Sequence, residues 1–588
     1  MKIKYLLTIV IAILLATFTS CDDSLLDIPR KGVVPKDDFY KTDNDAQDAL
    51  AIIYRTAWTW MYDSDHGSYP LLKNLLSDEL YTGGLVRNDQ TLWEAVNEFA
   101  FATENTYILG FFQRAYNVIY RCNLIIDNFS GDNLNTPIKR RALAEAKVWR
   151  AFVYMELITL WGTPPLVDHC LAPDEYSQPN GDPQELWNLV TTDLTDAINS
   201  GALYQKTTMN DKFANVTLGY AQALLGKAYV FMTYSLNGGA KGGSDAIAAP
   251  AKALSATEYW SKAAEVLDRV INSNMYRLYQ GDFTNIYKTS LNFDPENMFE
   301  FNRSPYNNST ASLNLRPGWE SYLHGWATGQ IFAYGEIVPC VRSSNFMQPR
   351  KAAYDKMVAW SGGEDNNRMY GSIRTYNQIV NNMQVATIPG VVTIYASEGL
   401  FDMKWFRDEN DDCKGGNHYT EKGYPTMRYA EVLLLAAEAH LMNGNQVKAD
   451  EYMNQVRNRA GLSNMTGITL HDLQQEKQCE LYFEGTRAYD LVRWGLAAEV
   501  LKDQGRDFPY FTVWTDGTTN PVSFVATRWE GIVTAGSETY TLGVSRINVN
   551  ESGYGFKSGK HELLPFPNRE MLLSGEVVGG PLKQNPGW

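Results

Sequence analysis

The sequence predicts a mainly α-helical protein, in which a scaffold of paired helices carries a loop-rich half and minor β-structure. Two observations support this prediction. Apolar residues recur three and four positions apart in two separate groups of segments, which is the spacing of helices that bury one face. Between these groups, from about residue 279 to residue 425, glycine, asparagine, serine and proline interrupt every such pattern.

The first group of predicted helices lies near 44–62, 107–129, 137–161, 183–200, 215–235 and 257–273. In the third, Val148, Phe152 and Met155 fall on one face, and Gly162 followed by a pair of prolines ends the helix. The second group lies near 427–443, 446–460, 469–485 and 487–501. The paired amphipathic helices, with small residues such as Gly226 at their contacts, predict tetratricopeptide-like packing.

After residue 20, a chain of 588 residues predicts one large domain or two intimately joined domains. The expected parts are a helical scaffold at about 40–278 and 426–505, a loop-rich insertion at about 279–425 and an irregular segment at 506–588. Aromatic residues cluster in the insertion without periodicity, and loops carried on a rigid scaffold are the usual place for binding sites. The irregular segment has short alternating stretches that predict minor strands, such as Val522–Val525 and Tyr540–Val544.

Residues 1–20 are typical of a lipoprotein signal peptide. Lys2 and Lys4 precede an apolar run over residues 5–19, which is short for a membrane span, and the run ends at Ser20 and Cys21. We expect Cys21 to become the lipidated first residue, so that the protein is anchored to the membrane and does not span it. An ordinary signal peptide with an incidental cysteine is the alternative. No later segment is long and apolar enough to cross a membrane.

Composition excludes some classes of function. The 588 residues carry a formal net charge of −15, and an acidic chain repels phosphate backbones, which argues against nucleic acid as a partner. Apart from Cys21, five scattered cysteines form no CxxC pair, so we expect buried thiols instead of disulfides or a zinc site. Aromatic residues make up 13% of the chain, and such rings either fill the core or stack on sugars.

Three carboxylates stand at helical spacing near the second group of helices. Glu476, Glu480 and Glu484 fall at i, i+4 and i+8, which places them along one stripe of a helix. Metal ligation or acid–base chemistry would use such a stripe, but Arg487 and Arg493 follow closely and no histidine stands at a chelating distance. We therefore expect ion pairs that order a junction between helices.

Other polar residues in the same region receive the same interpretation. Asp490, Arg493 and Trp494 are expected to form a second polar cluster of the scaffold. Within an otherwise apolar helix, the carboxylates of Glu431 and Glu438 are expected to meet the arginines of the next helix, Arg457 or Arg459.

The sequence offers little support for catalysis. It contains no Ser-His-Asp signature, nucleophile elbow, HExxH or glycine-rich nucleotide motif. A glycosidase needs two carboxylates that face each other roughly 5 to 10 Å apart. The positions of the acidic residues along this sequence do not identify such a pair. No Asp-rich loop of the EF-hand type is present. We expect no catalytic residue, cofactor or metal ion.

Several long blocks resemble the SusD/RagB family. They are CDDSLLDIPRKGVVP at 21–35, AEAKVWRAFVYMELITLWGTPPLV at 144–167, a block at 219–231, PENMFEF at 295–301, YPTMRYAEVLLLAAEAHLMNGNQVKADEYMNQVRNRAGL at 424–462, EKQCELYFEGTRAYDLVRWG at 476–495, and LPFPNREM with QNPGW in 564–588. The blocks are specific in their order and spacing, and together they run from residue 21 to residue 588.

The resemblance implies a surface lipoprotein that forms a single domain over residues 21–588. Four tetratricopeptide-like helix pairs are expected in it, arranged as a right-handed superhelix and wrapped by an irregular ligand-binding half. Proteins of this kind cap a TonB-dependent (SusC-like) transporter in the outer membrane and help to deliver oligosaccharides, or peptides in some members. They are typically not enzymes. By this resemblance the protein is expected on the cell surface, anchored at Cys21, with an oligosaccharide as its ligand. A peptide-binding member and a surface glycoside hydrolase are the alternatives.

Two groups of residues are candidates for the ligand site. The first is Asp78, Tyr81, Arg87, Asn88 and Trp93, in a segment broken by two glycines, where loops of similar proteins contribute to the glycan site. The second is Trp319, Tyr322, His324, Trp326, Tyr334 and Trp360 in the insertion. For each single residue the alternative is packing beneath a loop. Trp319 and Trp326 are the leading candidates, because glycines flank them and no helical period includes them.

Overall fold

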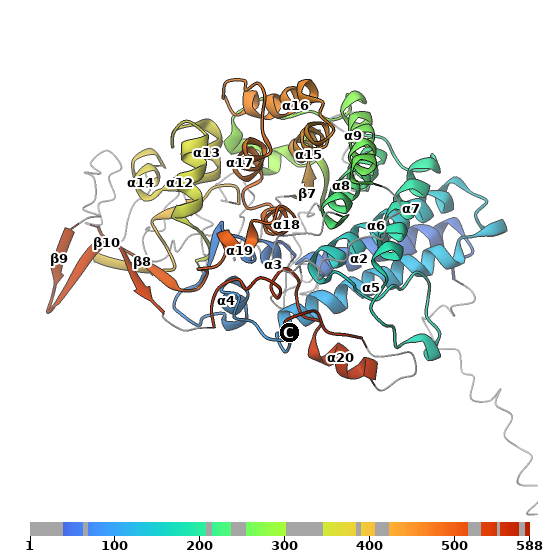
Figure 1. The fold of residues 1–588 in the computed structure, drawn as a ribbon, viewed down its shortest axis with the longest axis horizontal. Helices are drawn as coiled ribbons and strands as arrows, with labels where there is room; N and C mark the ends of the chain where they lie inside the picture. The colour runs from blue at the N-terminus through green and yellow to red at the C-terminus, as the bar shows by residue number, and fades with distance from the viewer. Residues whose placement is uncertain are drawn as a thin grey trace, which may run out of the picture.

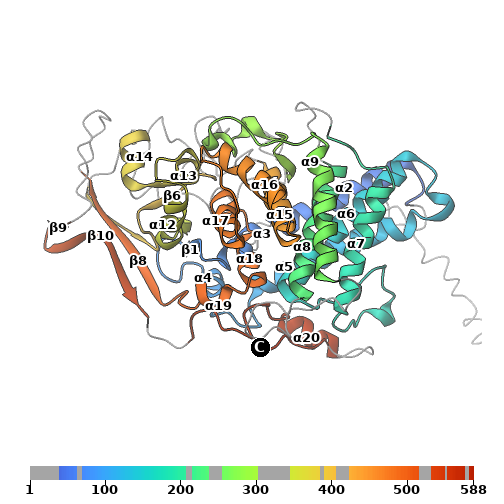
Figure 2. The same cartoon turned by 45° about the horizontal axis from the view of Figure 1, so that its top comes forward.

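The computed structural model describes residues 39–62, 69–206, 215–236, 255–301, 345–383, 390–405, 423–515, 531–549, 553–575 and 582–588. The fold is mainly α-helical, as the sequence predicts, and the strands within residues 507–548 lie at one side, on the left of Figures 1 and 2. Cys21 and the predicted signal peptide lie outside the described residues, as does the stretch Val522–Val525. Among the described residues, no helix combines the length and apolar character needed to cross a membrane.

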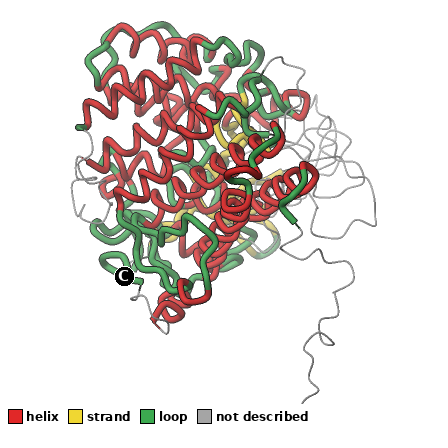
Figure 3. The backbone as a smooth tube through the Cα atoms, turned by 90° about the vertical axis from the view of Figure 1, so that its right-hand side faces the viewer, coloured by secondary structure: helices red, strands yellow, loops and turns green. Residues whose placement is uncertain are grey.

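The scaffold is a series of helices in which each packs against the next. They are α2 (Asp43–Tyr62), α5 (Thr106–Asn128), α6 (Pro137–Trp161), α7 (Pro183–Asn199), α8 (Leu218–Leu236), α9 (Ala256–Asn272), α15 (Tyr429–Met442), α16 (Gln446–Arg459) and α17 (Leu470–Leu481). Helices α5 to α9 pack in chain order, and α15 and α16 continue the series from α9. Figure 3 shows helices stacked side by side over much of the molecule. The expected helices are therefore present. Their tetratricopeptide-like pairing and right-handed superhelix remain predictions.

Helix α6 shows why these segments are helical. The Thr136 hydroxyl accepts a hydrogen bond from the Lys139 backbone N–H, and Pro137 occupies the first turn, where its missing N–H is not needed. Gly162 ends the helix with φ +75°, a conformation that favours glycine.

Helices in the middle of the series are covered on several sides, and α15 is buried along nearly its whole length from Tyr429 to His440.

The segment between the two helical groups is more regular than the sequence predicts. Its described part contains β2 (Asn297–Phe301), β3 (Phe346–Pro349), α12 (Lys351–Trp360), α13 (Asn367–Ser372), β4 (Ile373–Thr375), α14 (Tyr376–Met383), β5 (Gly390–Tyr395) and β6 (Leu400–Asp402). None of these helices exceeds 10 residues, so none spans enough turns to produce a clear apolar period.

The remaining elements complete the core and form the sheets. They are α3 (Tyr69–Leu75), β1 (Leu80–Gly83), α4 (Thr91–Asn97), β7 (Tyr424–Arg428), α18 (Arg487–Arg493), α19 (Ala497–Val500), β8 (Asp507–Thr515), β9 (Gly531–Ala535), β10 (Glu538–Asn548) and α20 (Asn568–Gly575). Strands β5, β8, β10 and β9 form an antiparallel sheet in that order, and β1–β3, β2–β7 and β4–β6 are two-stranded. The predicted strand Tyr540–Val544 lies in β10, which confirms that prediction.

A buried ionic cluster joins the scaffold to the middle segment. Its members are Glu296, Glu476, Glu480, Glu484, Arg368, Arg428, Arg457, Arg459 and Lys404. The Glu480 carboxylate lies 2.9 Å from Arg428 and 3.4 Å from Arg368, and it also contacts Arg459. The prediction of ion pairs is confirmed, but Arg487 and Arg493 take no part in the cluster.

The stripe of three carboxylates is not wholly helical. Helix α17 ends at Leu481, and Phe483 has φ +63°, so Glu484 lies beyond the helix. Its carboxylate still reaches the cluster, where it lies 2.7 Å from both Lys404 Nζ and Arg428 Nη2. Burial alone would raise the pKa of the Glu484 carboxyl, but these two cations hold the pKa at about 2.

Other scaffold ion pairs differ from the expected ones. Glu438 receives two hydrogen bonds from Arg493, at 2.7 and 2.9 Å, and Arg493 also binds Asp490, so the second polar cluster is confirmed. The carboxylate of Glu431 lies 2.9 Å from Lys227 of α8. The prediction that Glu431 and Glu438 meet Arg457 or Arg459 is wrong, because both arginines point to the buried ionic cluster.

The described cysteines partly follow the prediction of buried thiols. Cys122 and Cys479 are buried, whereas Cys170 is half-buried. Cys340 and Cys413 lie outside the described residues.

Residues 582–588 form a strap across the early helices. The Trp161 indole N–H donates to the Pro565 carbonyl at 2.9 Å, and the Asn585 amide donates to the carbonyls of Trp161 and Leu564 at 3.0 and 2.7 Å. The ring of Trp588 stacks on Phe101 with centroids 4.9 Å apart. The strap therefore covers the C-terminal end of helix α6.

Replacing Glu480 by glutamine should lower the free energy of unfolding by about 3–5 kcal/mol, because the change leaves buried arginines without their counter-charge. Urea denaturation of the two proteins measures the difference. Glu451 makes an exposed pair with Lys448, so Glu451→Gln is the matched control and should stay within about 0.5 kcal/mol of the original. A Glu480→Gln protein as stable as the control would show that the cluster contributes little to the fold.

Candidate functional site

The first group of candidate residues surrounds the loop between β1 and α4, residues 84–90, which we call the β1–α4 loop. Two glycines start the loop, Gly83 with φ +76° and Gly84 with φ +107°. A Cβ atom on Gly83 would lie only 2.0 Å from the carbonyl oxygen of Asn345. Glycine is therefore required where β1 meets the chain that leads into β3.

Hydrogen bonds at its base fix the conformation of the β1–α4 loop. The Leu85 backbone N–H donates to the Asp89 carboxylate at 2.9 Å, and the Asn88 N–H donates to the Glu94 carboxylate at 2.9 Å. At the tip, Leu85 and Val86 are 48% and 62% exposed. The loop thus presents two apolar side chains and the exposed Asn88 on a base held in place from below.

Arg87 is bound to the protein and only half-exposed. Its guanidinium donates two hydrogen bonds to the Glu98 carboxylate, one of them 3.1 Å long, and lies 3.4 Å from the Tyr395 hydroxyl. It also covers the Phe508 ring at 3.8 Å from the centroid. These contacts join the β1–α4 loop to β5 and β8, which follow it by more than 300 residues.

Glu94 is the most perturbed carboxyl beneath the loop. Burial raises the pKa of Glu94 to about 7, although Arg87, 3.7 Å away, opposes the shift. Burial also raises the pKa of the Glu98 carboxyl, against the effect of its hydrogen bonds with Arg87. A carboxyl that holds its proton near neutral pH can donate as well as accept hydrogen bonds.

Asp78 and Tyr81 are buried in the structure. The Asp78 carboxylate accepts two hydrogen bonds from Arg487, at 2.9 and 3.1 Å. Tyr81 is 5% exposed, with the Arg350 guanidinium 4.0 Å from the centroid of its ring. Both residues therefore support the loop from within, and neither presents its side chain to a ligand in this conformation.

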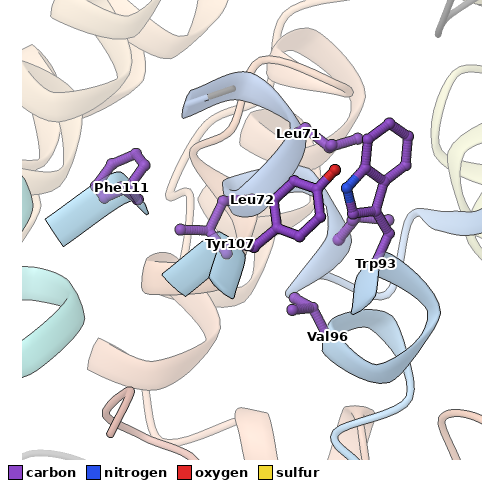
Figure 4. Close-up of a pocket in the computed structure, with 7 residues that line it drawn as sticks. Leu71, Leu72, Trp93, Val96, Tyr107 and Phe111 are labelled. Carbon is purple, nitrogen blue, oxygen red and sulfur yellow. The ribbon is translucent and has the colours of Figure 1, made fainter. Parts of the chain in front are cut away.

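Trp93 packs in the core. Its ring meets Tyr107 and Phe346 edge-on, with centroids 5.4 and 5.0 Å apart, and it is 1% exposed. The neighbouring cavity is lined by Leu71, Leu72, Leu75, Trp93, Val96, Tyr107 and Phe111 (Figure 4). Its volume is about 10 Å³, which is at the limit for one water molecule and too small for a sugar ring. Trp93 therefore presents no face to a ligand in this conformation, and the structure gives no support to its place among the candidate ligand-site residues.

The second group of candidates is largely outside the described residues. Trp319, Tyr322, His324, Trp326 and Tyr334 all fall there. Trp360 is described and half-buried at the end of α12. Its indole N–H donates to the Glu476 carboxylate at 2.7 Å, and the Arg457 guanidinium lies 5.4 Å from its ring centroid. Trp360 thus borders the buried ionic cluster.

Asn345 connects the two groups of candidates. It is the first described residue after 302–344, and its side-chain amide donates to the carbonyls of Gly84 and Tyr395, both at 3.0 Å. Residue 345, where the described chain resumes, therefore lies beside the β1–α4 loop.

Sequence reasoning missed the residues that hold the loop from the other strands. Tyr395 and Phe508 pack together with Tyr81 in a small aromatic cluster, separate in sequence from the loop and from each other. No local pattern joins such distant positions. In the part of the chain that the structure describes, no three His, Cys, Asp or Glu side chains gather in a way that could hold a metal ion.

The pKa of Glu94 makes stability depend on pH. The folded protein retains the Glu94 proton up to about pH 7, whereas the unfolded chain loses it near 4.5, so the stabilisation is lost as the pH rises from 4.5 to 7. The melting temperature should therefore fall with rising pH more steeply in the original protein than in Glu94→Gln, which cannot ionise. Glu79 and Glu300, with pKa values raised by burial to about 8 and about 7, add to the slope in both proteins. If the melting temperatures of the two proteins fall in parallel as the pH rises, Glu94 is not a source of the pH dependence.

Comparison with known proteins identifies the family. Residues 275–588 match the SusD family. The chain is 26% identical over 525 residues to SusD-like protein P2 of Formosa agariphila, covering 85% of this chain and 93% of that protein.

Solved structures share the fold. A laminarin-binding SusD-like protein superposes with a TM-score of 0.67 at 21% identity, covering 93% of this chain and 100% of its own. The surface glycan-binding protein A of Bacteroides thetaiotaomicron, in complex with laminarihexaose, gives 0.66 at 20% identity, covering 92% and 99%. The resemblance in the sequence is confirmed, and because the family match spans more than half of the chain, the protein belongs to the SusD family.

Proposed function

We propose that this protein is a cell-surface lipoprotein that binds oligosaccharides without cleaving them and delivers them to a TonB-dependent outer-membrane transporter. Membership of the SusD family is the observation that carries the proposal. Two proteins with the same fold bind laminarin or laminarihexaose, which supports a glycan as the ligand class. The lipoprotein pattern that ends at Cys21 supports the location.

The proposed binding surface combines the β1–α4 loop with aromatic residues of the segment 302–344. Asn345 supports this combination, because it ties the point where the segment returns to the fold to Gly84. Trp319 and Trp326 are the proposed stacking platforms, since an indole face covers the apolar side of a sugar while its N–H remains available for hydrogen bonding. Tyr322 and Tyr334 would add further rings and hydroxyl groups.

A binding screen of residues 22–588 against plant, microbial and host glycans and a peptide pool tests the proposal. We expect saturable binding to one glycan class, with no shortened products when the same samples are analysed by chromatography. Binding of peptides alone would assign the protein a peptide ligand. The appearance of cleavage products would refute a purely binding role.

Variants of the two leading tryptophans extend the same test. Trp319→Ala or Trp326→Ala should weaken binding of the glycan identified in the screen by about 2 kcal/mol or more. The melting temperature of each variant should be unchanged. Trp93→Ala is the contrasting control, because removal of a buried indole should lower stability by about 3–5 kcal/mol. If the Trp319→Ala and Trp326→Ala proteins both unfold like the control, these tryptophans belong to the core.

Replacing Cys21 by alanine should release the protein from the membrane fraction while its glycan binding is retained, because the lipid is the proposed anchor. Fractionation of cells and immunoblotting of the pellet and supernatant measure the change. Cys170→Ala, at a half-buried cysteine of the folded body, is the matched control and should remain in the pellet. A Cys21→Ala protein that stays in the pellet would rule out this anchor.

A further inference from the structure

The sheet β5–β8–β10–β9 has two chemically different faces. In an antiparallel sheet, residues directly opposite each other on neighbouring strands share a face, and alternate residues of a strand share a face. Ile394 and Phe511 are such a pair, and both are buried. The ring of Phe511 packs against Tyr376 of α14, with centroids 5.5 Å apart. This face therefore covers the body of the protein, at the side shown on the left of Figure 1.

The register assigns the other residues to the opposite face, which we call the open face. Its members are Val391, Thr393 and Tyr395 of β5, Phe508, Tyr510, Thr512 and Trp514 of β8, Thr539, Thr541, Gly543, Ser545 and Ile547 of β10, and Ile532 and Thr534 of β9. A 2.9 Å hydrogen bond between the hydroxyls of Thr393 and Thr512 agrees with this assignment. Ser545 stands directly opposite Tyr510, which stands opposite Tyr395.

The open face carries no charged residue of its own strands and is accessible mainly on β9 and β10, whereas Tyr395, Phe508 and Thr512 are buried. Every side chain on it is aromatic, aliphatic or a hydroxyl, and the charged Asp507, Glu538 and Arg546 belong to the opposite face by their register. Thr393, Thr541 and Ser545 are exposed, and Ile532 and Ile547 are 75% and 55% exposed. Tyr510 and Trp514 are half-buried, so each ring keeps part of its surface open to solvent.

The open face is continuous with the candidate site. The Arg87 guanidinium covers Phe508 at one end of β8, and the Tyr395 hydroxyl lies 3.4 Å from Arg87. Further along, the rings of Tyr395 and Tyr510 are 5.5 Å apart. From Phe508 to Trp514 the strand extends roughly 20 Å at about 3.3 Å per residue. A surface of this length accommodates several sugar units.

We propose that the open face binds an extended, uncharged polysaccharide chain, which runs along β8 from the β1–α4 loop to Trp514. The proposal rests on the glycan-binding function proposed above and specifies its ligand class. Rings and hydroxyls match the apolar faces and hydroxyl groups of neutral sugars. Arg87 is the one cation that the described residues place on this path, and its guanidinium already binds the Glu98 carboxylate. Beyond Arg87, a polyanion would give up part of its hydration on this face without meeting a cation in return.

A pair of variants on neighbouring residues of β10 tests the proposal. Ser545→Arg places a long side chain on the open face beside Tyr510. Val544→Arg, at a residue that is 41% exposed, places the same side chain and charge on the opposite face. The purified proteins are compared by native electrophoresis in gels that contain laminarin, starch, xylan, galactomannan or the polyanion alginate. Sedimentation velocity reports the oligomeric state of each protein.

We expect one of the neutral polysaccharides to retard the original protein, Ser545→Arg to bind it roughly tenfold more weakly or worse, and Val544→Arg to bind like the original. Equal binding by all three would overturn the open face as a binding surface but leave the proposed function intact. If alginate alone retards the protein, the proposal that the ligand is uncharged is wrong. A protein that no polysaccharide retards would refute both proposals. A dimer abolished only by Ser545→Arg would assign the face to a second copy instead.

Discussion

The structure depends most on the buried ionic cluster around helix α17. Four carboxylates and five cations are withdrawn from water there, and each ion is tolerated only because its partners are present. The participants come from α13, α16 and α17, from β7, and from the residues around β2 and β6. Because these elements belong to both the scaffold and the middle segment, the cluster fixes one half of the protein against the other.

Local physics explains which features the sequence alone predicts. Helix α6 is recognisable because its cap, its first-turn proline and its terminal glycine all act within a few residues of the chain. The spacing of Glu476 and Glu480 likewise indicates ion pairs, because side chains four apart share a helix face. The ion-pair partners of these side chains cannot be predicted from local spacing. Glu431 binds a lysine of α8, not an arginine of the next helix, and that choice depends on how helices stack in three dimensions.

The same distinction applies to the candidate site. Its two glycines mark the β1–α4 loop in the sequence, because only glycine adopts their backbone conformation so close to Asn345. Sequence reasoning could not separate Arg87, which borders solvent, from Trp93, which fills the core. One sequence signal was available, because Trp93 and Val96 stand three positions apart, which is the spacing of one helix face. In the structure both residues are buried on α4. Nothing local could have shown that Tyr395 and Phe508 meet the loop, because strand pairing brings them there.

The strap at residues 582–588 has a consequence for the rate of folding. Asn585 bonds to Trp161 across 424 residues, so helix α6 acquires this contact only after the chain has been synthesised as far as Asn585. Contacts of such high sequence separation raise the contact order, and proteins rich in them fold slowly. Until the strap docks, the carbonyl of Trp161 lacks this partner and the ring of Phe101 lacks its stacked neighbour. The incomplete fold thus exposes apolar surface to other chains, and this interval is when aggregation competes with folding.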